Sequence, residues 1–202
     1  MMWTTGAIFI GGAGSRMGGC DKSRLELDGQ PFWSILLDIM RTCVDEIIFI
    51  GNEQPDWWSP TQKAGFLTDY KPEGHQIGPT GALVAGLEFL AARNRPSILL
   101  TAPVDTPFLS PDIVLTLRDQ ISEDCPVAIA GDEIRRQPMI GAWSVETFRS
   151  VRRHVDDGAR AMNRLADHHD ARTITFSDAQ SFLNINTPED LAFAKSLRHQ
   201  HP

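Results

Sequence analysis

The chain has 202 residues, of which 42% are hydrophobic and 22% are charged, and its formal net charge is −7. This length suits one domain, and we expect a single domain over residues 1–202 that buries a substantial core. The negative charge and the lack of a basic run argue against an extended nucleic-acid surface, so no nucleic-acid partner is expected.

The cysteines and the apolar segments indicate the cellular setting. The three cysteines form no C-x-x-C pair, so neither a disulfide framework nor a structural zinc site is expected. The N-terminus lacks a charged segment followed by a long apolar stretch, and no apolar run approaches membrane-spanning length. We therefore expect a cytoplasmic protein that does not bind a membrane.

Short apolar runs alternate with amphipathic stretches along the chain. The predicted strands cover residues 7–10, 46–50, 65–68, 97–102, 126–130 and 138–143. The predicted helices cover residues 31–42, 81–93, 111–121, 145–154 and 159–168, and a last helix begins at Pro188. This alternation predicts a three-layer, Rossmann-like α/β fold with a mainly parallel sheet and helices on both faces. In such sheets, ligands bind outside the carboxyl ends of the strands.

A glycine-rich segment, GGAGSRMGGCDK at residues 11–22, follows the first predicted strand and carries Arg16 and Lys22. Glycine lets a ligand approach the backbone closely, and successive N–H groups in such a turn can bind an anion. Arginine and lysine add the positive charge that phosphates need. The segment predicts a loop around a nucleoside triphosphate, and the alternative is a surface turn that happens to be rich in glycine.

The spacing of this segment argues against two other nucleotide-binding loops. The dinucleotide fingerprint needs G-x-G-x-x-G, but the sixth residue counted from Gly12 is Met17. A Walker A loop needs Gly-Lys-Ser/Thr, but Gly19 is followed by Cys20. An NAD-dependent dehydrogenase is therefore disfavoured.

Asp105 follows the predicted buried strand at 97–102 and stands between two prolines, Pro103 and Pro107. Mg²⁺ sites in proteins usually use one or two carboxylates together with substrate phosphates. Phosphoryl transfer relies mainly on positioning and charge neutralisation, so one carboxylate beside the glycine-rich loop can suffice. We expect Asp105 to hold Mg²⁺, and the alternative is a turn with Thr106 that caps the next helix.

Other polar residues lie at the ends of predicted elements. Asp69 follows the strand at 65–68 and is expected either to accept hydrogen bonds from a base or ribose or to stabilise a turn. Gly78 precedes a helix whose first N–H groups have no partner within the helix. Asn184 and Asn186 precede the last helix, where asparagine is also a common cap or turn residue.

Four motifs in this order resemble the molybdenum cofactor guanylyltransferases, which belong to a wider family of nucleotidyltransferases. They are FIGGAGSRMG at 9–18 followed by Lys22, LELDGQPF at 25–32, DTPF at 105–108 and NINTPEDL at 184–191. The first motif departs from the family pattern, because Phe9 and Ile10 replace the usual Leu-Ala. The pair Gly11–Gly12 matches the guanylyl form of the motif, whereas cytidylyl relatives tend to carry Ala-Gly there, so GTP is favoured.

The resemblance implies an enzyme that joins GTP to molybdopterin and releases pyrophosphate. The catalytic residues that it implies are Arg16 and Lys22, which would stabilise the triphosphate, and Asp105, which would hold Mg²⁺. The nucleotide-binding residues that it implies are Phe9, Gly11, Gly12, Lys22, Asn52, Asp69, Gly78 and Asp105.

The resemblance also places the nucleotide in the N-terminal half and molybdopterin in the C-terminal half. The implied acceptor-binding residues are Arg135, Arg136, Gly158, Arg160, Asn184 and Asn186, although solvated surface charge explains the arginines equally well. Molybdenum-insertion proteins and acceptor molybdoenzymes are the protein partners that it implies. Three alternatives remain: an enzyme that uses CTP, one that uses a sugar-phosphate acceptor, and a nucleotide-binding module without catalysis.

Overall fold

A seven-stranded sheet forms the centre of the computed structural model, which describes residues 2–11 and 21–200. The strand order is β5-β4-β1-β6-β8-β7-β9. Neighbouring strands pair in parallel except for β8, which is antiparallel to both β6 and β7. The strands are β1 (Trp3–Phe9), β4 (Glu46–Gly51), β5 (Gly65–Thr68), β6 (Ser97–Pro103), β7 (Val127–Gly131), β8 (Arg136–Ser144) and β9 (Arg172–Thr175).

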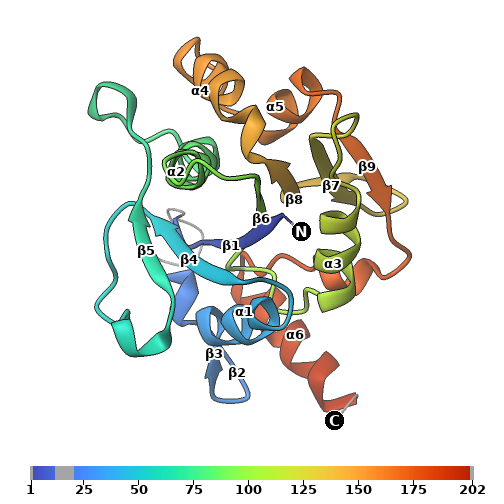
Figure 1. Ribbon diagram of the computed structural model, residues 1–202. Helices are drawn as coiled ribbons and strands as arrows, with labels where there is room; N and C mark the ends of the chain where they lie inside the picture. Colours follow the sequence, from blue (N-terminus) through green and yellow to red (C-terminus); the bar gives the residue numbers. More distant parts are fainter. Residues whose placement is uncertain (1, 12–20, 201–202) are drawn as a thin grey trace.

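Helices cover both faces of this sheet (Figure 1). One face carries α1 (Phe32–Arg41) and α3 (Pro111–Asp119), with α6 (Pro188–Gln200) at its margin. The other face carries α2 (Pro79–Ala91), α4 (Phe148–Asp156) and α5 (Met162–His168). The predicted three-layer α/β/α fold with a mainly parallel sheet is therefore confirmed.

Burial on both faces explains the composition of the central strands. Every residue of β6 is buried, and its sequence SILLTAP is nearly continuous in apolar character rather than alternating. Leu100 packs into the core beneath α1 and α3, whereas its neighbour Leu99 packs into the core beneath α2, α4 and α5. Strands covered by helices on both sides have this pattern because both sets of side chains leave water.

Two strand features lie outside the predicted set. The short strand β9 pairs with β7 at the edge of the sheet, and its residues are mostly exposed, so it lacks an apolar run. A hairpin of β2 (Glu26–Leu27) and β3 (Gln30–Pro31) precedes α1. Its turn residues Asp28 and Gly29 have φ of 52° and 77°, the conformation that favours Asp-Gly in tight hairpins.

Several predicted helix boundaries differ from the observed ones by one to three residues. Pro31 belongs to β3, so α1 begins one residue later than predicted. The segment predicted as one helix from 145 begins with a 3-10 turn at Val145–Thr147 before α4, and the next helix begins at Met162 rather than at 159.

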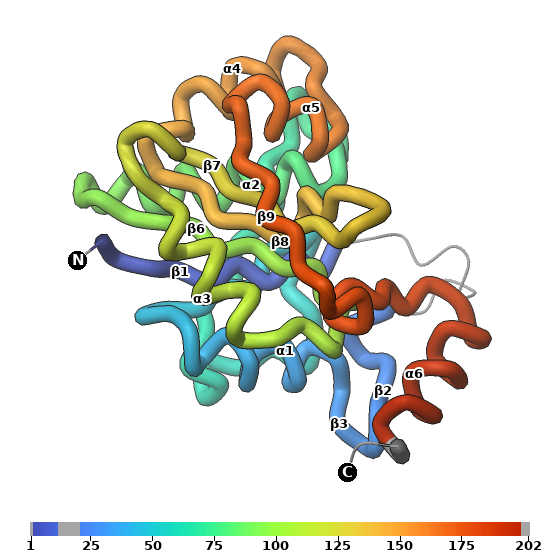
Figure 2. Tube along the Cα trace, turned by 90° about the vertical axis from the view of Figure 1, so that its right-hand side faces the viewer, coloured from blue at the N-terminus to red at the C-terminus, as the bar shows by residue number. Residues whose placement is uncertain are grey.

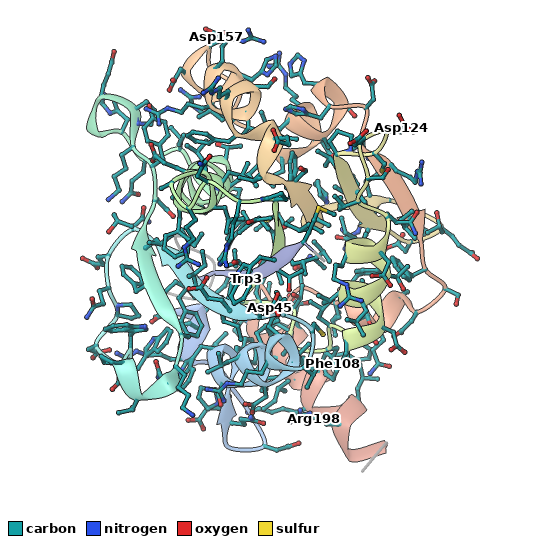
Figure 3. The ribbon with its side chains drawn as sticks, viewed as in Figure 1. Trp3, Asp45, Phe108, Asp124, Asp157 and Arg198 are labelled. Atoms are coloured by element: carbon teal, nitrogen blue, oxygen red, sulfur yellow. The ribbon has the colours of Figure 1, made fainter. Side chains whose placement is uncertain are left out.

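The last helix lies beside the β2–β3 hairpin in both views (Figures 1 and 2). Arg198, labelled near the end of α6 in Figure 3, has its Nη1 3.9 Å from Oδ2 of Asp28 in the hairpin turn. No helix in residues 2–11 and 21–200 is long and apolar enough to cross a membrane.

Candidate active site

The carboxyl ends of β1, β4, β5 and β6 lie along one edge of the sheet because these strands are parallel. Backbone hydrogen bonds continue the pairing just beyond the strands: the N–H of Asp69 donates to Gly51 (2.9 Å) and the N–H of Val104 donates to Phe9 (3.0 Å). This register brings Gly11, Asn52, Asp69 and Asp105 to the same edge, although they are far apart in sequence.

A cavity of about 130 Å³ opens at this edge, between the strand ends and the start of α2. Its lining residues are Phe9, Gly11, Asn52, Asp69, Gln76, Gly78, Pro79 and Ala82. The lining includes five of the eight residues that the family resemblance assigns to nucleotide binding. Gln76, Pro79 and Ala82 are additional, and the only sequence signal for them is their position around Gly78 at a predicted helix start.

Asp69 lines this cavity and has an unsatisfied carboxylate oxygen. Its Oδ1 is buried and has no hydrogen-bond partner among the residues that the structure describes. Burial raises the pKa of Asp69 to about 6, and the nearby Lys71 partly opposes that rise. Leaving a buried acceptor unpaired costs about 1–3 kcal/mol. The cavity is therefore suited to a ligand that brings N–H donors to Asp69.

Two glycines shape the cavity wall. A Cβ atom at Gly11 would lie 3.4 Å from Oδ2 of Asp69, so any side chain there would occupy the space in front of the carboxylate. Gly78 has φ 68° and ψ −148°, a conformation that other residues rarely adopt, and it immediately precedes α2. Glycine at these positions keeps the cavity open and lets the chain turn into the helix.

Three polar side chains from distant parts of the chain meet at the end of β6. The Nζ of Lys22 lies 2.8 Å from Oδ2 of Asp105 and also donates a hydrogen bond to Oδ1 of Asn186. The Lys22 and Asp105 side chains are each 18% exposed. The N–H of Ile185 donates to the backbone oxygen of Asp105 (3.0 Å), which places Asn186 beside the carboxylate.

Asp190, in the first turn of α6, holds the segment that carries Asn186. Its Oδ2 accepts hydrogen bonds from the N–H groups of Asn186 and Thr187, both at 2.9 Å, and its own N–H donates to Oγ1 of Thr187 (3.1 Å). These bonds, above all the one from Asn186, hold the pKa of Asp190 below its usual range. The signal in the sequence is the spacing of Thr187 and Asp190, which is that of a reciprocal helix cap.

The oxygen atoms at this point fit a metal ion that arrives with a substrate. No group of three or more histidine, cysteine or acidic side chains in the described part of the chain could hold a metal by itself. The Asp105 carboxylate and the Asn186 amide oxygen are hard donors, and both contact the cationic ammonium of Lys22. Mg²⁺ commonly binds through so few protein oxygens when phosphates and water complete its shell.

The other residues implied by the resemblance are placed differently. Arg160 donates to the backbone oxygens of Val155, in the last turn of α4, and of Ala159, at 2.6 and 3.0 Å, and Arg136 pairs with Asp167. Arg135 is exposed in the turn between β7 and β8. These arginines thus do not join the cluster of Lys22, Asp105 and Asn186, and Asn184 is half-buried. The predicted residues Gly12 and Arg16 lie outside the described residues.

Comparison with known proteins gives consistent matches over most of the chain. Residues 6–173 match the family model of the MobA-like NTP transferase domain. A molybdenum cofactor guanylyltransferase of Cereibacter sphaeroides is 35% identical over 192 residues, which is 95% of each chain. One of Shewanella sediminis is 28% identical over 184 residues, or 90% of each chain.

Two solved structures share the fold at low sequence identity. Molybdopterin-guanine dinucleotide biosynthesis protein A from Archaeoglobus fulgidus superposes with a TM-score of 0.78 at 20% identity, covering 97% of this chain and 99% of its own. 4-Diphosphocytidyl-2C-methyl-D-erythritol synthase from Anaerococcus prevotii gives a TM-score of 0.76 at 14% identity, covering 98% and 96%. By its family match and its curated relatives, this chain belongs to the MobA-like NTP transferase domain family and is a nucleotidyltransferase.

Proposed function

We propose that this chain is a molybdenum cofactor guanylyltransferase, which transfers GMP from GTP to molybdopterin and releases pyrophosphate. The observation that carries the proposal is that Asp69, whose Oδ1 is buried and has no partner among the described residues, lines a cavity at the same sheet edge as the cluster of Lys22, Asp105 and Asn186. The relatives from Cereibacter sphaeroides and Shewanella sediminis carry this name, and their similarity to this chain extends over nearly their whole length.

Asp69 supports the choice of guanine. Guanine presents two neighbouring N–H donors on its base-pairing edge, and an ionised carboxylate can accept both. Adenine and cytosine each present a ring nitrogen acceptor in the matching place, which would face the carboxylate unfavourably. With a pKa of about 6, Asp69 is ionised at neutral pH and acts as an acceptor. Gly11 leaves the space in front of it open.

The triphosphate would extend from this cavity toward Asp105. Lys22 supplies a compact cation with three donors, suited to phosphate oxygens. Asp105 would hold Mg²⁺ beside Asn186, and the bound ion supplies charge neutralisation to the phosphates. Arg16, on the glycine-rich segment, is proposed as a second cation for the departing pyrophosphate.

The reaction exchanges one phosphoryl bond for another. An oxygen of the molybdopterin phosphate forms a bond to the α-phosphorus of GTP, and the bond from that phosphorus to the β-phosphate bridging oxygen breaks. Positive charge near that oxygen stabilises the pyrophosphate as it leaves. The acceptor would enter from the C-terminal half, where Asn184, Asn186, Arg135 and Arg160 are the proposed contacts.

Nucleotide binding measured by calorimetry tests the base assignment. The purified protein is titrated with GTP, CTP and ATP in the presence of Mg²⁺ at pH 7.5. We expect GTP to bind at least about tenfold more tightly than the other two, since a site built to pair specific N–H groups discriminates strongly against bases that lack them. Preferential binding of CTP or ATP would overturn the assignment of guanine.

A further inference from the structure

Lys22 lies on a short turn whose shape is set from another part of the chain. The turn is the 3-10 segment Lys22–Arg24, which follows the segment outside the described residues. A lysine side chain has a flexible four-carbon stem, and ordering it costs conformational entropy. The direction in which Lys22 reaches Asp105 therefore depends on a backbone that is held firmly on both sides of it.

A chain of hydrogen bonds holds the residues on either side of Lys22. The indole Nε1 of Trp57 donates to Oγ of Ser23 (3.0 Å). That hydroxyl donates in turn to Oδ1 of Asp21 (2.6 Å), which also accepts the N–H of Ser23 (3.0 Å). Ser23 is completely buried, at 0% exposure. The bonds thus fix Asp21 and Ser23 without touching the Lys22 ammonium.

Trp57 is itself held by the hydrophobic core. Its ring stacks on Trp33 of α1 with centroids 4.8 Å apart and an interplanar angle of 3°. It also meets the ring of Phe49 of β4 edge to face, with centroids 5.1 Å apart. Stacked and edge-to-face aromatic pairs add stability beyond simple burial. These contacts with α1 and β4 hold the Trp57 ring so that its indole N–H points to Ser23.

A second contact from the same loop is weaker. Asp56 forms an ion pair with Arg24, the last residue of the turn, but the Asp56 side chain is 76% exposed. Exposed ion pairs contribute about 0–1 kcal/mol. The partly buried bond from Trp57 to Ser23 is therefore the contact that should matter most to the position of Lys22.

We infer that Trp57 is a positioning residue for Lys22: it holds the turn through Ser23 so that the lysine ammonium lies ready for the nucleotide phosphates. The inference rests on the proposed function, because it assumes that Lys22 binds the triphosphate. It gives the adjacent residues Trp57 and Trp58 two different roles. The Nε1 of Trp58 donates to the backbone oxygen of Ala64 (3.1 Å), away from the turn.

This difference supplies a matched pair of variants. Trp57→Phe keeps an aromatic ring but deletes the N–H that reaches Ser23, whereas Trp58→Phe deletes an indole N–H of the same loop that serves only Ala64. The affinities for Mg·GTP and for guanosine are measured by calorimetry for both variants, for Lys22→Met, and for the double variant Trp57→Phe/Lys22→Met. Amide hydrogen exchange at Ser23 is measured without nucleotide.

We expect Trp57→Phe to weaken GTP binding by about 3- to 10-fold, the range for one intramolecular hydrogen bond, while guanosine binding stays unchanged. Trp58→Phe should match the wild type for both ligands. In the Lys22→Met background, Trp57→Phe should cause no further loss, because the two residues act as one unit. Exchange at Ser23 should speed up in Trp57→Phe and not in Trp58→Phe.

Three results would overturn the inference: wild-type GTP affinity in Trp57→Phe, an equal loss of guanosine affinity, or a loss that persists in the Lys22→Met background. If Lys22→Met itself left GTP affinity unchanged, the proposed role of Lys22 would fail. In that case, faster Ser23 exchange in Trp57→Phe would still support the bracing of the turn, and unchanged exchange would refute it.

Discussion

Replacing Asp69 by asparagine should make the protein more stable and a poorer GTP binder at the same time. The carboxylate has a pKa raised to about 6 by burial, and its Oδ1 lacks a partner in the described part of the chain. The ordinary pKa of an aspartate, which we take for the unfolded chain, is 3.8. The folded state therefore holds the proton more tightly than the unfolded state does.

The sign of the stability effect follows from these two pKa values. Below about pH 4 both states are protonated and Asp69 costs nothing. As the pH rises from about 4 to 6, the unfolded state loses this proton while the folded state keeps it, so stability falls, and above about pH 6 the folded state carries the full cost of a buried charge. The full shift corresponds to about 3 kcal/mol, which partial exposure of the side chain reduces to about 1–2 kcal/mol. Asp69→Asn removes this cost at pH 7.5.

The effect on binding has the opposite sign. The carboxylate is proposed to accept two N–H groups of guanine, and hydrogen bonds to charged groups are worth about 1.5–3 kcal/mol each. Asparagine keeps one acceptor oxygen but turns an NH₂ donor toward the base. We expect a loss of about 2–3 kcal/mol, which is roughly a 30- to 150-fold weaker GTP affinity. In the wild type, the affinity should be full at about pH 7 and above and should decline as the pH falls through about 6.

Thermal unfolding at pH 7.5 tests the predicted gain in stability, and calorimetric titration with GTP tests the predicted loss of affinity. A matched control is Asp132→Asn: backbone N–H groups of Arg135 and Ile134 hold the pKa of Asp132 below its usual value, so this substitution should not raise the melting temperature. If Asp69→Asn lowered the melting temperature and kept wild-type GTP affinity, the reasoning about the cavity would be refuted.

Three further substitutions test other parts of the site. Asp105→Asn should abolish Mg²⁺-dependent turnover with an unchanged circular dichroism spectrum, because the bond from Ile185 uses the backbone oxygen; near wild-type activity would contradict the metal assignment. Gly11→Ala should weaken GTP binding more than CTP binding in a titration, because its Cβ would lie 3.4 Å from Asp69; equal losses would speak against a purine in this space. Asp190→Ala should lower the free energy of urea unfolding by about 1 kcal/mol through loss of the cap, and an unchanged midpoint would contradict that role.

Much of the fold could be predicted because burial leaves a clear pattern. The apolar run of β6 marks a strand covered on both faces, and the same holds for the other central strands. Edge elements lack that pattern. The residues of β9 are mostly exposed and bury little apolar surface, so its only signal is a short run of β-branched side chains. The hairpin before α1 had a signal in Asp28–Gly29, but its strands have two residues each.

The candidate site also has a part that the sequence predicts and a part that it does not. Asp69 and Asp105 stand directly after apolar runs, so the rule for parallel sheets places them at one edge. Their contacts depend on register and on helix placement: Asn186 reaches Lys22 only because Ile185 bonds to the backbone of Asp105. No sequence pattern predicts the role of Trp57, because its bond to Ser23 joins two irregular segments that are 34 residues apart.

The most direct test of the proposed activity is pyrophosphate release by the purified protein with Mg²⁺ and molybdopterin, with GTP, CTP and ATP compared in parallel. The proposal predicts release with GTP, dependent on molybdopterin, and none above background with the other two. Release with CTP in place of GTP would contradict the choice of base. If no nucleotide led to pyrophosphate release although GTP bound tightly, guanylyl transfer to this acceptor would be contradicted.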